Sequence, residues 1–322
     1  MKAIRIHQTG QAEVLQPEEL PRPEPGDNEV MIKVAAAGVN FIDIYHRTGL
    51  YDRAVPFTPG LEAAGLVEAV GPGVTEFKVG DRVASSSVAG AYAEYALIPE
   101  SKAVPVPEGV SLAQAAASLL QGMTAHYLVH STYPLSSEDV CLVHAAAGGT
   151  GQLLVQMAKK AGATVIGTVS AEEKAQLAYQ AGTDHVIRYT ETDFEAETMR
   201  LTSGAGVNVV YDSVGPATFY KSLNVLRPRG YLVLFGQSSG KVPPFDLNRL
   251  GGGGSLYVTR PSLFHYIAGR QELLWRAGDL FDWLASGAVT HRIDQELPLA
   301  QAAQAHRLLE DRKTAGKLLL VP

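Results

Sequence analysis

The chain contains 322 residues, with 27 Lys and Arg against 33 Asp and Glu and a formal net charge of −6. This length indicates about two domains, and an acidic chain without a block of like charges argues against nucleic acid as a partner. The single cysteine, Cys141, excludes internal disulfides and cysteine-rich zinc sites.

Two stretches of the sequence bear on where the protein is found in the cell: the beginning of the chain and its least charged segment. The sequence "MKAIRIHQTG" alternates as a strand does and has no apolar signal region. The stretch 110–137 has no charged residue, but glutamine, histidine and proline interrupt it, which argues against a membrane span. We therefore expect a soluble, cytoplasmic protein.

The first 120 residues alternate short apolar runs with turn sequences such as "PRPEPGDN", "GPGV" and "KVGDRV", which is typical of a β-rich domain. Short strands must close or cover their edges, so the pattern favours a compact barrel. Ala, Leu and Gln at helical spacing over 111–129 predict a long helix that leads into a second domain. The strands that we expect before it are 2–7, 29–36, 63–70 and 93–98.

From residue 139 the pattern becomes a regular alternation of strands and helices. This order predicts a parallel sheet with right-handed crossovers, and hence a protein of the α/β class. The expected strands are 140–143, 163–169, 185–189, 207–213 and 230–235. The expected helices are 149–161, 171–181, 193–201 and 216–226.

The turn after the first of these strands carries the frame of a dinucleotide-binding fingerprint. Ala146, Gly148 and Gly151 occupy its glycine positions, with alanine at the first. Small residues there let the backbone approach a pyrophosphate, and the N–H groups of the new helix point at it. Close packing of a strand on a helix also selects glycine, but the strands and helices that follow favour the nucleotide site.

The end of the second strand indicates which cofactor is bound. Ser170 stands nineteen residues after Gly151, where a site for NADH has Asp or Glu, and Lys174 follows four residues later. A hydroxyl and an ammonium bind a 2'-phosphate, which a carboxylate would repel, so we expect NADPH. Ser170 with Glu173 also matches a capping box, a role compatible with phosphate binding. Lys174 could instead be a solvated surface lysine.

The last quarter of the chain changes character again. Residues 254–260 follow four glycines and would add a sixth strand to the sheet, and 263–285 and 299–310 have helical spacing. The apolar tail "GKLLLVP" is expected to return to the first domain. An uncovered edge strand at 254–260 favours a homodimer, with a tetramer left open.

Several long motifs occur in an order that is known from one superfamily. They are "AAAGVNFIDIYHRTGLY" at 35–51, "PFTPGLEAAGLVEAVGPGV" at 56–74, "FKVGDRV" at 77–83, "GAYAEY" at 90–95, "QAAASLLQGMTAHYLV" at 114–129, "HAAAGGTG" at 144–151, "VVYDSVG" at 209–215 and "YVTRPSL" at 257–263. With them the chain resembles the medium-chain dehydrogenases/reductases, and among these the zinc-independent NADPH:quinone oxidoreductases related to zeta-crystallin.

This resemblance implies a two-domain architecture. A catalytic domain with a GroES-like β-barrel would span 1–122 and 263–322. A Rossmann NADPH-binding domain with a doubly wound parallel sheet would be inserted at 123–262, and the active site would lie in the cleft between the two domains.

The resemblance also bears on metal binding. Zinc-dependent members have a cysteine where this chain has Asn40, and Gly-His-Glu where it has Gly60, Leu61 and Glu62. One glutamate cannot hold a catalytic zinc, which needs about three protein ligands. We therefore expect no metal.

Without a Lewis acid, a substrate that accepts hydride readily is the logical partner, and a quinone is such a substrate. The resemblance implies that Asn40 and Tyr45 lie beside the nicotinamide and that Tyr51 and Gln237 line the substrate cleft. Their phenols and amides could donate to a quinone oxygen. Tyr45 and Tyr51 could also be ordinary half-buried aromatics.

The resemblance further implies a set of cofactor-binding residues. Tyr189 and Ser213 end predicted strands, where open parallel sheets bind ligands. Many relatives have Lys in place of Gln121 and Asn in place of Gln237, which makes the substrate less certain than the cofactor. The set is Asn40, Thr124, Gly148, Gly149, Thr150, Ser170, Lys174, Tyr189, Ser213, Phe235, Gly236, Ser238 and Lys317.

Two other functions fit the same motifs. One is NADPH-dependent reduction of enones or 2-alkenals, which needs the same domains and no zinc. The other is a non-catalytic role, since some members of the family are structural lens proteins or RNA-binding proteins. The excess of acidic over basic residues and the lack of a basic, aromatic-rich stripe argue against RNA binding.

Overall fold

The computed structural model describes residues 1–322, and the chain divides into two compact units. Unit 1 comprises Met1–Gln121 and Ala268–Pro322, and unit 2 comprises Gly122–Ile267. The sequence analysis assigned 263–267 to the first domain. In the structure this segment belongs to unit 2, because the ring of Tyr266 stacks on Tyr127 with 4.3 Å between centroids.

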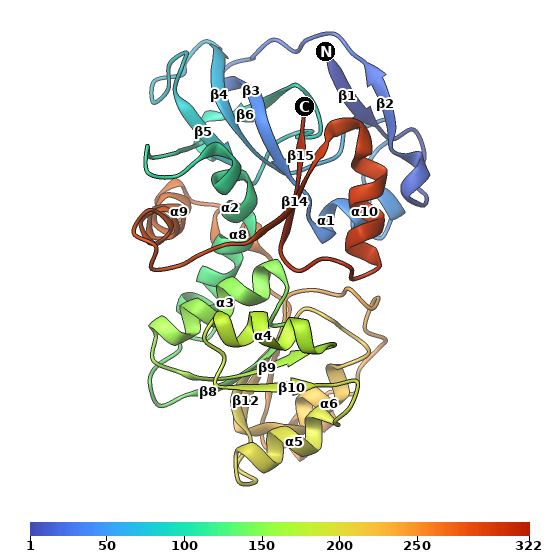
Figure 1. Ribbon diagram of the computed structural model, residues 1–322, viewed down its shortest axis with the longest axis vertical. Helices are drawn as coiled ribbons and strands as arrows, with labels where there is room; N and C mark the ends of the chain where they lie inside the picture. The colour runs from blue at the N-terminus through green and yellow to red at the C-terminus, as the bar shows by residue number, and fades with distance from the viewer. The chain divides into compact units, whose positions relative to one another are not determined.

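Unit 1 is built on a seven-stranded, mostly antiparallel sheet with the order β14-β15-β3-β4-β5-β7, in which β6 also pairs with β3. A two-stranded sheet of β1 and β2 lies beside it in the unit (Figure 1). The strands are β1 (Lys2–Arg5), β2 (Gln16–Glu19), β3 (Glu29–Gly38), β4 (Glu62–Val70), β5 (Arg82–Ser85), β6 (Tyr95–Pro99), β7 (Val104–Pro105), β14 (Ile293–Pro298) and β15 (Lys317–Val321).

The ten-residue strand β3 connects the parts of this sheet. It pairs along its length with β4, while β6 pairs with its first half and β15 with its end, at Ala37 and Gly38. The tail of the chain therefore returns to unit 1. The strand β14, which pairs in parallel with β15, was not expected from the sequence.

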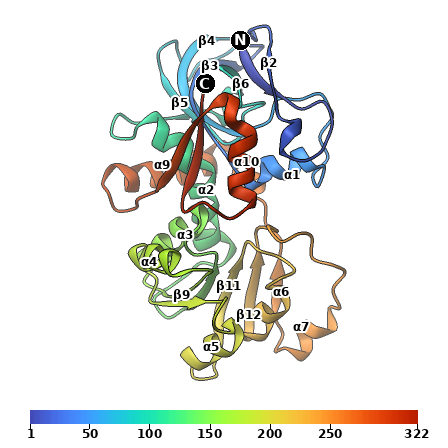
Figure 2. The same ribbon diagram turned by 45° about the vertical axis from the view of Figure 1, so that its right-hand side comes forward.

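The helices of unit 1 include one short helix that the sequence analysis missed, α1, which directly follows β3. The helices are α1 (Phe41–Thr48), α9 (Arg270–Ala285) and α10 (Ala302–Glu310); α2 (Leu112–Tyr127) runs from unit 1 into unit 2. Figures 1 and 2 both show α1 and α10 side by side. This pairing brings residues more than 250 positions apart in sequence into contact.

Unit 2 contains a six-stranded sheet with the order β10-β9-β8-β11-β12-β13, and every pair in it is parallel. The strands are β8 (Val140–His144), β9 (Thr164–Val169), β10 (His185–Arg188), β11 (Val207–Asp212), β12 (Leu226–Leu234) and β13 (Tyr257–Thr259). The predicted α/β class and the doubly wound parallel sheet are confirmed.

The helices of unit 2 are α3 (Gly149–Lys160), α4 (Glu172–Gln180), α5 (Phe194–Leu201), α6 (Phe219–Asn224), α7 (Asn248–Gly252) and α8 (Leu263–Tyr266). Helices α3 and α4 contact each other, and so do α5 and α6, as expected when the crossovers leave β8 in two directions (Figure 2). Helices on both faces explain why β8 and β11 are buried along almost their whole length. None of the helices is both long and apolar enough to cross a membrane.

Candidate functional site

The fingerprint turn joins β8 to α3 with an unusual backbone conformation. Ala145 adopts a positive φ of 53°, and its carbonyl accepts a hydrogen bond from the Gly148 N–H at 2.9 Å. A Cβ on Gly151 would lie 2.2 Å from that same carbonyl oxygen, so only glycine fits there. Helix α3 begins at Gly149, and its N-cap residue, Gly148, makes no side-chain capping hydrogen bond.

The predicted cofactor residues of unit 2 gather at one edge of its sheet. Thr124 lies in α2 and Lys174 in the first turn of α4. Of the others, three lie where the turn after β8 enters α3, and the rest lie within four residues after the ends of β9, β10, β11 and β12. This is the edge where open parallel sheets bind ligands. The residues at the strand ends are Gly148, Gly149, Thr150, Ser170, Tyr189, Ser213, Phe235, Gly236 and Ser238.

Two backbone contacts hold neighbouring strand ends together. The N–H of Ser238 donates to the carbonyl of Ser213 at 3.1 Å, and a Cβ on Gly236 would meet that carbonyl at 2.6 Å. The N–H of Tyr189 donates to the carbonyl of Val169 at 3.1 Å. The loop after β11 is therefore bonded to the loop after β12, and the end of β9 to the end of β10.

One prediction at this edge was wrong. Ser170 was expected to cap the following helix together with Glu173, but α4 begins at Glu172 and its N-cap residue is Ala171. The helix starts one residue later than the capping box requires, so the Ser170 hydroxyl does not perform this role.

A buried chain of hydrogen bonds that the sequence analysis missed lies behind the strand ends. Ser222 donates to Oδ2 of Asp212 at 3.3 Å, so its oxygen accepts from Nε2–H of His144 at 2.9 Å. Nδ1 of His144 then accepts from the hydroxyl of Thr168 at 2.9 Å. Burial lowers the pKa of His144, an effect that the Asp212 carboxylate opposes. A neutral imidazole with a defined tautomer thus connects β8, β9, β11 and α6.

The carboxylate of Asp212 continues this series of hydrogen bonds to the loop after β11. Its Oδ1 accepts from the N–H groups of Val214 at 2.7 Å and Gly215 at 3.1 Å, which fixes the loop that carries Ser213. No sequence motif indicates that His144, Thr168, Ser222 and Asp212 are partners, since these four residues come from four different strands and helices.

Gln237 lies in unit 2, between Gly236 and Ser238 in the loop after β12. Unit 1 holds the other predicted residues in two places. On α1, the ring of Tyr45 meets that of Tyr51 edge to face, with 5.2 Å between centroids, and the Tyr51 N–H donates to the Tyr45 carbonyl at 3.1 Å. Both tyrosines are half-buried. The structure therefore brings together the two phenols that the sequence analysis assigned to the substrate.

Asn40 and Lys317 meet in a buried ionic cluster with Glu62. The Lys317 ammonium lies 2.6 Å from Oδ1 of Asn40 and 2.6 Å from Oε2 of Glu62, and the side chains of Lys317 and Glu62 are both fully buried. The Asn40 amide donates to Oε2 of Glu62 at 2.8 Å and to the Gly38 carbonyl at 3.3 Å. The other carboxylate oxygen of Glu62 accepts from the Leu120 N–H at 2.6 Å.

Asn40 and Lys317 satisfy each other's polar groups within unit 1. The buried ammonium of Lys317 is held by Glu62 and Asn40. Both hydrogens of the Asn40 amide are donated, to Gly38 and Glu62, at the start of α1. The roles expected for these two residues at the cofactor stay predictions.

The donors present here do not fit a zinc ion. One carboxylate and one amide face an ammonium, and no group of three His, Cys, Asp or Glu side chains could hold a metal. A catalytic zinc needs about three protein ligands, so no step of the chemistry is assigned to a metal.

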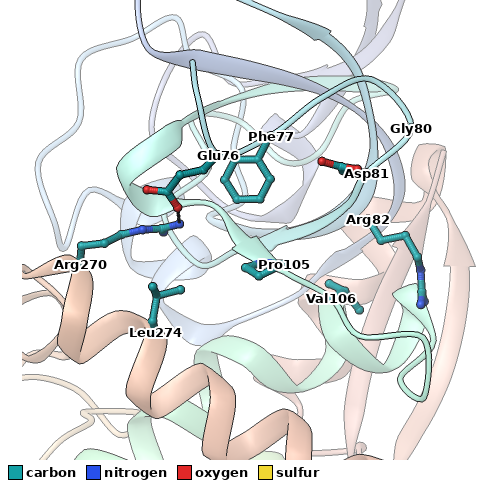
Figure 3. Close-up of a pocket in the computed structure, with 9 residues that line it drawn as sticks. All are labelled: Glu76, Phe77, Gly80, Asp81, Arg82, Pro105, Val106, Arg270 and Leu274. Atoms are coloured by element: carbon teal, nitrogen blue, oxygen red, sulfur yellow. Dashed lines mark hydrogen bonds and ion pairs between the residues drawn. The ribbon is translucent and has the colours of Figure 1, made fainter. Parts of the chain in front are cut away.

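A separate pocket of about 440 Å³ lies in unit 1 and contains none of the predicted site residues. Figure 3 shows Arg270 and Leu274 from α9 facing Glu76 and Phe77, with an ion pair between Arg270 and Glu76. The pocket is lined by Glu76, Phe77, Gly80, Asp81, Arg82, Pro105, Val106, Arg270 and Leu274.

Comparison with known proteins identifies the family. Residues 26–108 match the alcohol dehydrogenase GroES-like domain, and residues 149–281 match the model described as zinc-binding dehydrogenase. The chain is 45% identical over 323 residues to quinone oxidoreductase 1 of Escherichia coli K12, with 99% of each chain covered. The chain belongs to the quinone oxidoreductase family of medium-chain dehydrogenases/reductases. The resemblance seen in the sequence is thereby confirmed.

Two further relatives of this chain are named for different activities. The structure of Escherichia coli quinone oxidoreductase complexed with NADPH is 44% identical, with a TM-score of 0.97 and all of both chains covered. A 2-haloacrylate reductase from a Burkholderia species is 42% identical over 328 residues, with 99% of this chain and 98% of the relative covered. The family thus includes reductases of two kinds of acceptor.

The buried imidazole of His144 predicts how stability depends on pH. Because its pKa is lower in the folded than in the unfolded state, the unfolded chain binds more protons, and stability is lost as pH falls below about 6.5. A His144→Gln variant keeps an acceptor for Thr168 and a donor for Ser222 but does not titrate. The free energy of unfolding of the wild type, measured by urea titration, should fall relative to this variant by up to ~1.4 kcal/mol per pH unit.

His265→Gln, at an exposed histidine of the same unit, serves as the control and should run parallel to the wild type. Equal pH slopes for the wild type and His144→Gln would show that His144 is not held neutral by the fold.

Proposed function

We propose that this protein reduces quinones with NADPH, without a metal. The observation that carries the proposal is the full-length relationship to quinone oxidoreductases, one of them solved with NADPH. The phosphate-binding turn and the neutral end of β9 support the same cofactor. The expectation that the quinone binds in the cleft between the two domains stays a prediction.

The proposed chemistry needs few groups from the protein. NADPH, when bound, supplies a hydride to the quinone, and one proton from solvent completes the hydroquinone. Negative charge develops on a quinone oxygen during this transfer, and hydrogen-bond donors aimed at that oxygen stabilise the transition state. We assign this role to the hydroxyls of Tyr45 and Tyr51 and to the amide of Gln237.

The proposed cofactor contacts follow from where each residue lies on the sheet edge. The N–H groups of Gly149 and Thr150 would bind the pyrophosphate at the start of α3. Ser170 and Tyr189, at the ends of β9 and β10, and Lys174, in the first turn of α4, would bind the 2'-phosphate. The residues assigned to the nicotinamide half are Thr124, Ser213, Phe235, Gly236 and Ser238.

A second candidate function is the reduction of activated alkenes. The observation that favours it is the 2-haloacrylate reductase among the relatives. Both functions use the same cofactor and no metal, and they differ only in the acceptor. A cytoplasmic location is kept as part of the proposal.

The acceptor is tested with purified protein, NADPH and matched substrates, with oxygen excluded. We expect kcat/KM for ortho- and para-quinones to exceed that for 2-alkenals and 2-haloacrylate by at least ~10-fold, since reduction of a quinone restores an aromatic ring and makes it the better hydride acceptor. A higher kcat/KM for the alkenes would replace quinone reduction with the second candidate function. NADPH binding without turnover of either class would indicate a non-catalytic role.

The cofactor preference is tested at Lys174. Removing its charge in Lys174→Ala should raise the Kd of NADPH about 10-fold or more, because a charge-assisted bond to the 2'-phosphate is lost. The Kd of NADH, which lacks this phosphate, should not change. Lys78→Ala, an exposed lysine in unit 1, is the control for the loss of one positive charge. Parallel changes for NADH and NADPH would contradict the assignment.

We also propose a homodimer that forms through β13. This strand is the edge of the unit 2 sheet, and Tyr257 and Val258 on it are 50% and 37% exposed. An exposed apolar edge invites pairing with a second copy. Sedimentation equilibrium should give a dimer mass for the wild type and a monomer mass for Tyr257→Asp. Leu66→Asp, at an exposed apolar residue of the inner strand β4, should remain dimeric.

A further inference from the structure

Helix α1 packs on unit 1 through charged residues, where a short helix usually presents apolar ones. Asp43 and Arg47 lie one turn apart on its buried face, and both are 0% exposed. Buried charges are costly unless each finds a partner. The partners of these two side chains therefore determine how α1 is held.

Arg47 is held from α10. Its guanidinium donates to both carboxylate oxygens of Glu310, at 3.0 and 2.5 Å, and to Nδ1 of His306 at 3.3 Å. An arginine donates only, so Nδ1 of His306 must be the acceptor and Nε2 must carry the proton. Burial and the neighbouring Arg47 lower the pKa of His306 to about 3, which keeps the imidazole neutral in this tautomer.

The same chain continues to Asp43 through Tyr92. Nε2 of His306 lies 3.2 Å from the Tyr92 hydroxyl, which donates to Oδ2 of Asp43 at 3.0 Å. Oδ2 also accepts from the N–H of Asn40 at 2.9 Å, at the start of α1. In this series of hydrogen bonds each residue donates to the next: Arg47 to His306, His306 to Tyr92, and Tyr92 to Asp43. We call these four residues, with Glu310, the α1 anchor.

The opposite face of α1 carries Tyr45, and Tyr51 follows three residues after the end of the helix. Tyr45 lies between the two anchored positions in sequence, and its carbonyl holds the N–H of Tyr51. A rotation of α1 would therefore move both phenols. Small displacements of this kind reduce turnover strongly, because donors must be aligned with the reacting oxygen.

We propose that Tyr92 and His306 are positioning residues for the reduction reaction, because they fix the orientation of α1 and with it the Tyr45 hydroxyl. The proposal rests on the proposed function for the reaction that it names. In this proposal neither Tyr92 nor His306 touches the substrate. Both act through Asp43 and Arg47.

The charge on Asp43 adds a dependence on pH. Burial raises the pKa of Asp43 to about 7, against the hydrogen bonds from the Asn40 N–H and Tyr92. The groups that face it are Tyr92 and His306, Arg47 on its own helix, Lys317 from β15, Glu62 from β4, and Arg53. An ionised carboxylate accepts the two bonds more strongly than a neutral acid. The anchor is thus firmer above pH 7 than below it.

The first test compares two buried tyrosines. Tyr92→Phe removes the hydroxyl that connects His306 to Asp43, and should lower kcat about 10-fold with little change in the Kd of NADPH. Tyr211→Phe is the matched control, because this tyrosine is equally buried and loses a bond to the Leu128 carbonyl of 3.2 Å. It should lose similar thermal stability but keep the wild-type kcat. Equal kcat values for the two variants would overturn the proposal.

The second test uses rescue at His306. Glutamine can accept from Arg47 and donate to Tyr92, whereas leucine can do neither. We expect His306→Gln to retain kcat within about 3-fold of the wild type and His306→Leu to lose it about 10-fold or more. In Asp43→Asn, kcat should be low and should no longer rise as pH increases through 7. Equal losses in the glutamine and leucine variants would contradict a positioning role.

A readout independent of the acceptor separates this inference from the proposed function. Amide hydrogen exchange in α1 should be faster in Tyr92→Phe and unchanged in Tyr211→Phe. If the wild type reduces alkenes and not quinones, the proposed function fails, and the same kcat ratios measured with the alkene still test the anchor. If α1 exchanges equally in both variants, the inference fails although quinone reduction stands.

Discussion

The structure depends on one constraint above others: charged side chains that are taken out of water must meet their partners. Lys317 and Glu62 are both fully buried and lie 2.6 Å apart, so removing either would leave an uncompensated charge at a cost of about 3–5 kcal/mol. The pair joins the last strand of the chain to β4, and through Asn40 to the end of β3. It therefore closes the tail of the chain onto the sheet and fixes where α1 begins.

Both units use a neutral histidine to hold the elements that carry the proposed site. In unit 1, Arg47 forces Nδ1 of His306 to accept; in unit 2, Ser222 bonds to Asp212 and thereby forces Nε2 of His144 to donate. In each case a group of fixed polarity at one end sets the direction of all the other hydrogen bonds. Satisfied networks of this kind hold a single arrangement, since reversing one bond would leave others unmade.

Local patterns predicted much of unit 2 and less of unit 1. The parallel strands of unit 2 are continuous apolar runs with helical stretches between them, so their period was clear from the sequence. Helix α1 was missed because its buried face consists of Asp43, Ile44 and Arg47, so two charged residues lie where an amphipathic helix normally buries apolar ones. Strand β14 was missed as well: its burial pattern has one buried residue, Leu297, and does not alternate.

The sequence by itself determined the α/β fold, the glycine-rich turn between β8 and α3, and the family, because each of these depends on residues that are neighbours in the chain or on motifs in a fixed order. Only the tertiary structure decided that Lys317 binds Asn40 and Glu62, and that Tyr92 connects Asp43 to His306. Asn40 and Lys317 are 277 positions apart, and Tyr92 and His306 are 214 apart. The partner of a buried polar group is chosen by which strands and helices pack together, and no local pattern contains that information.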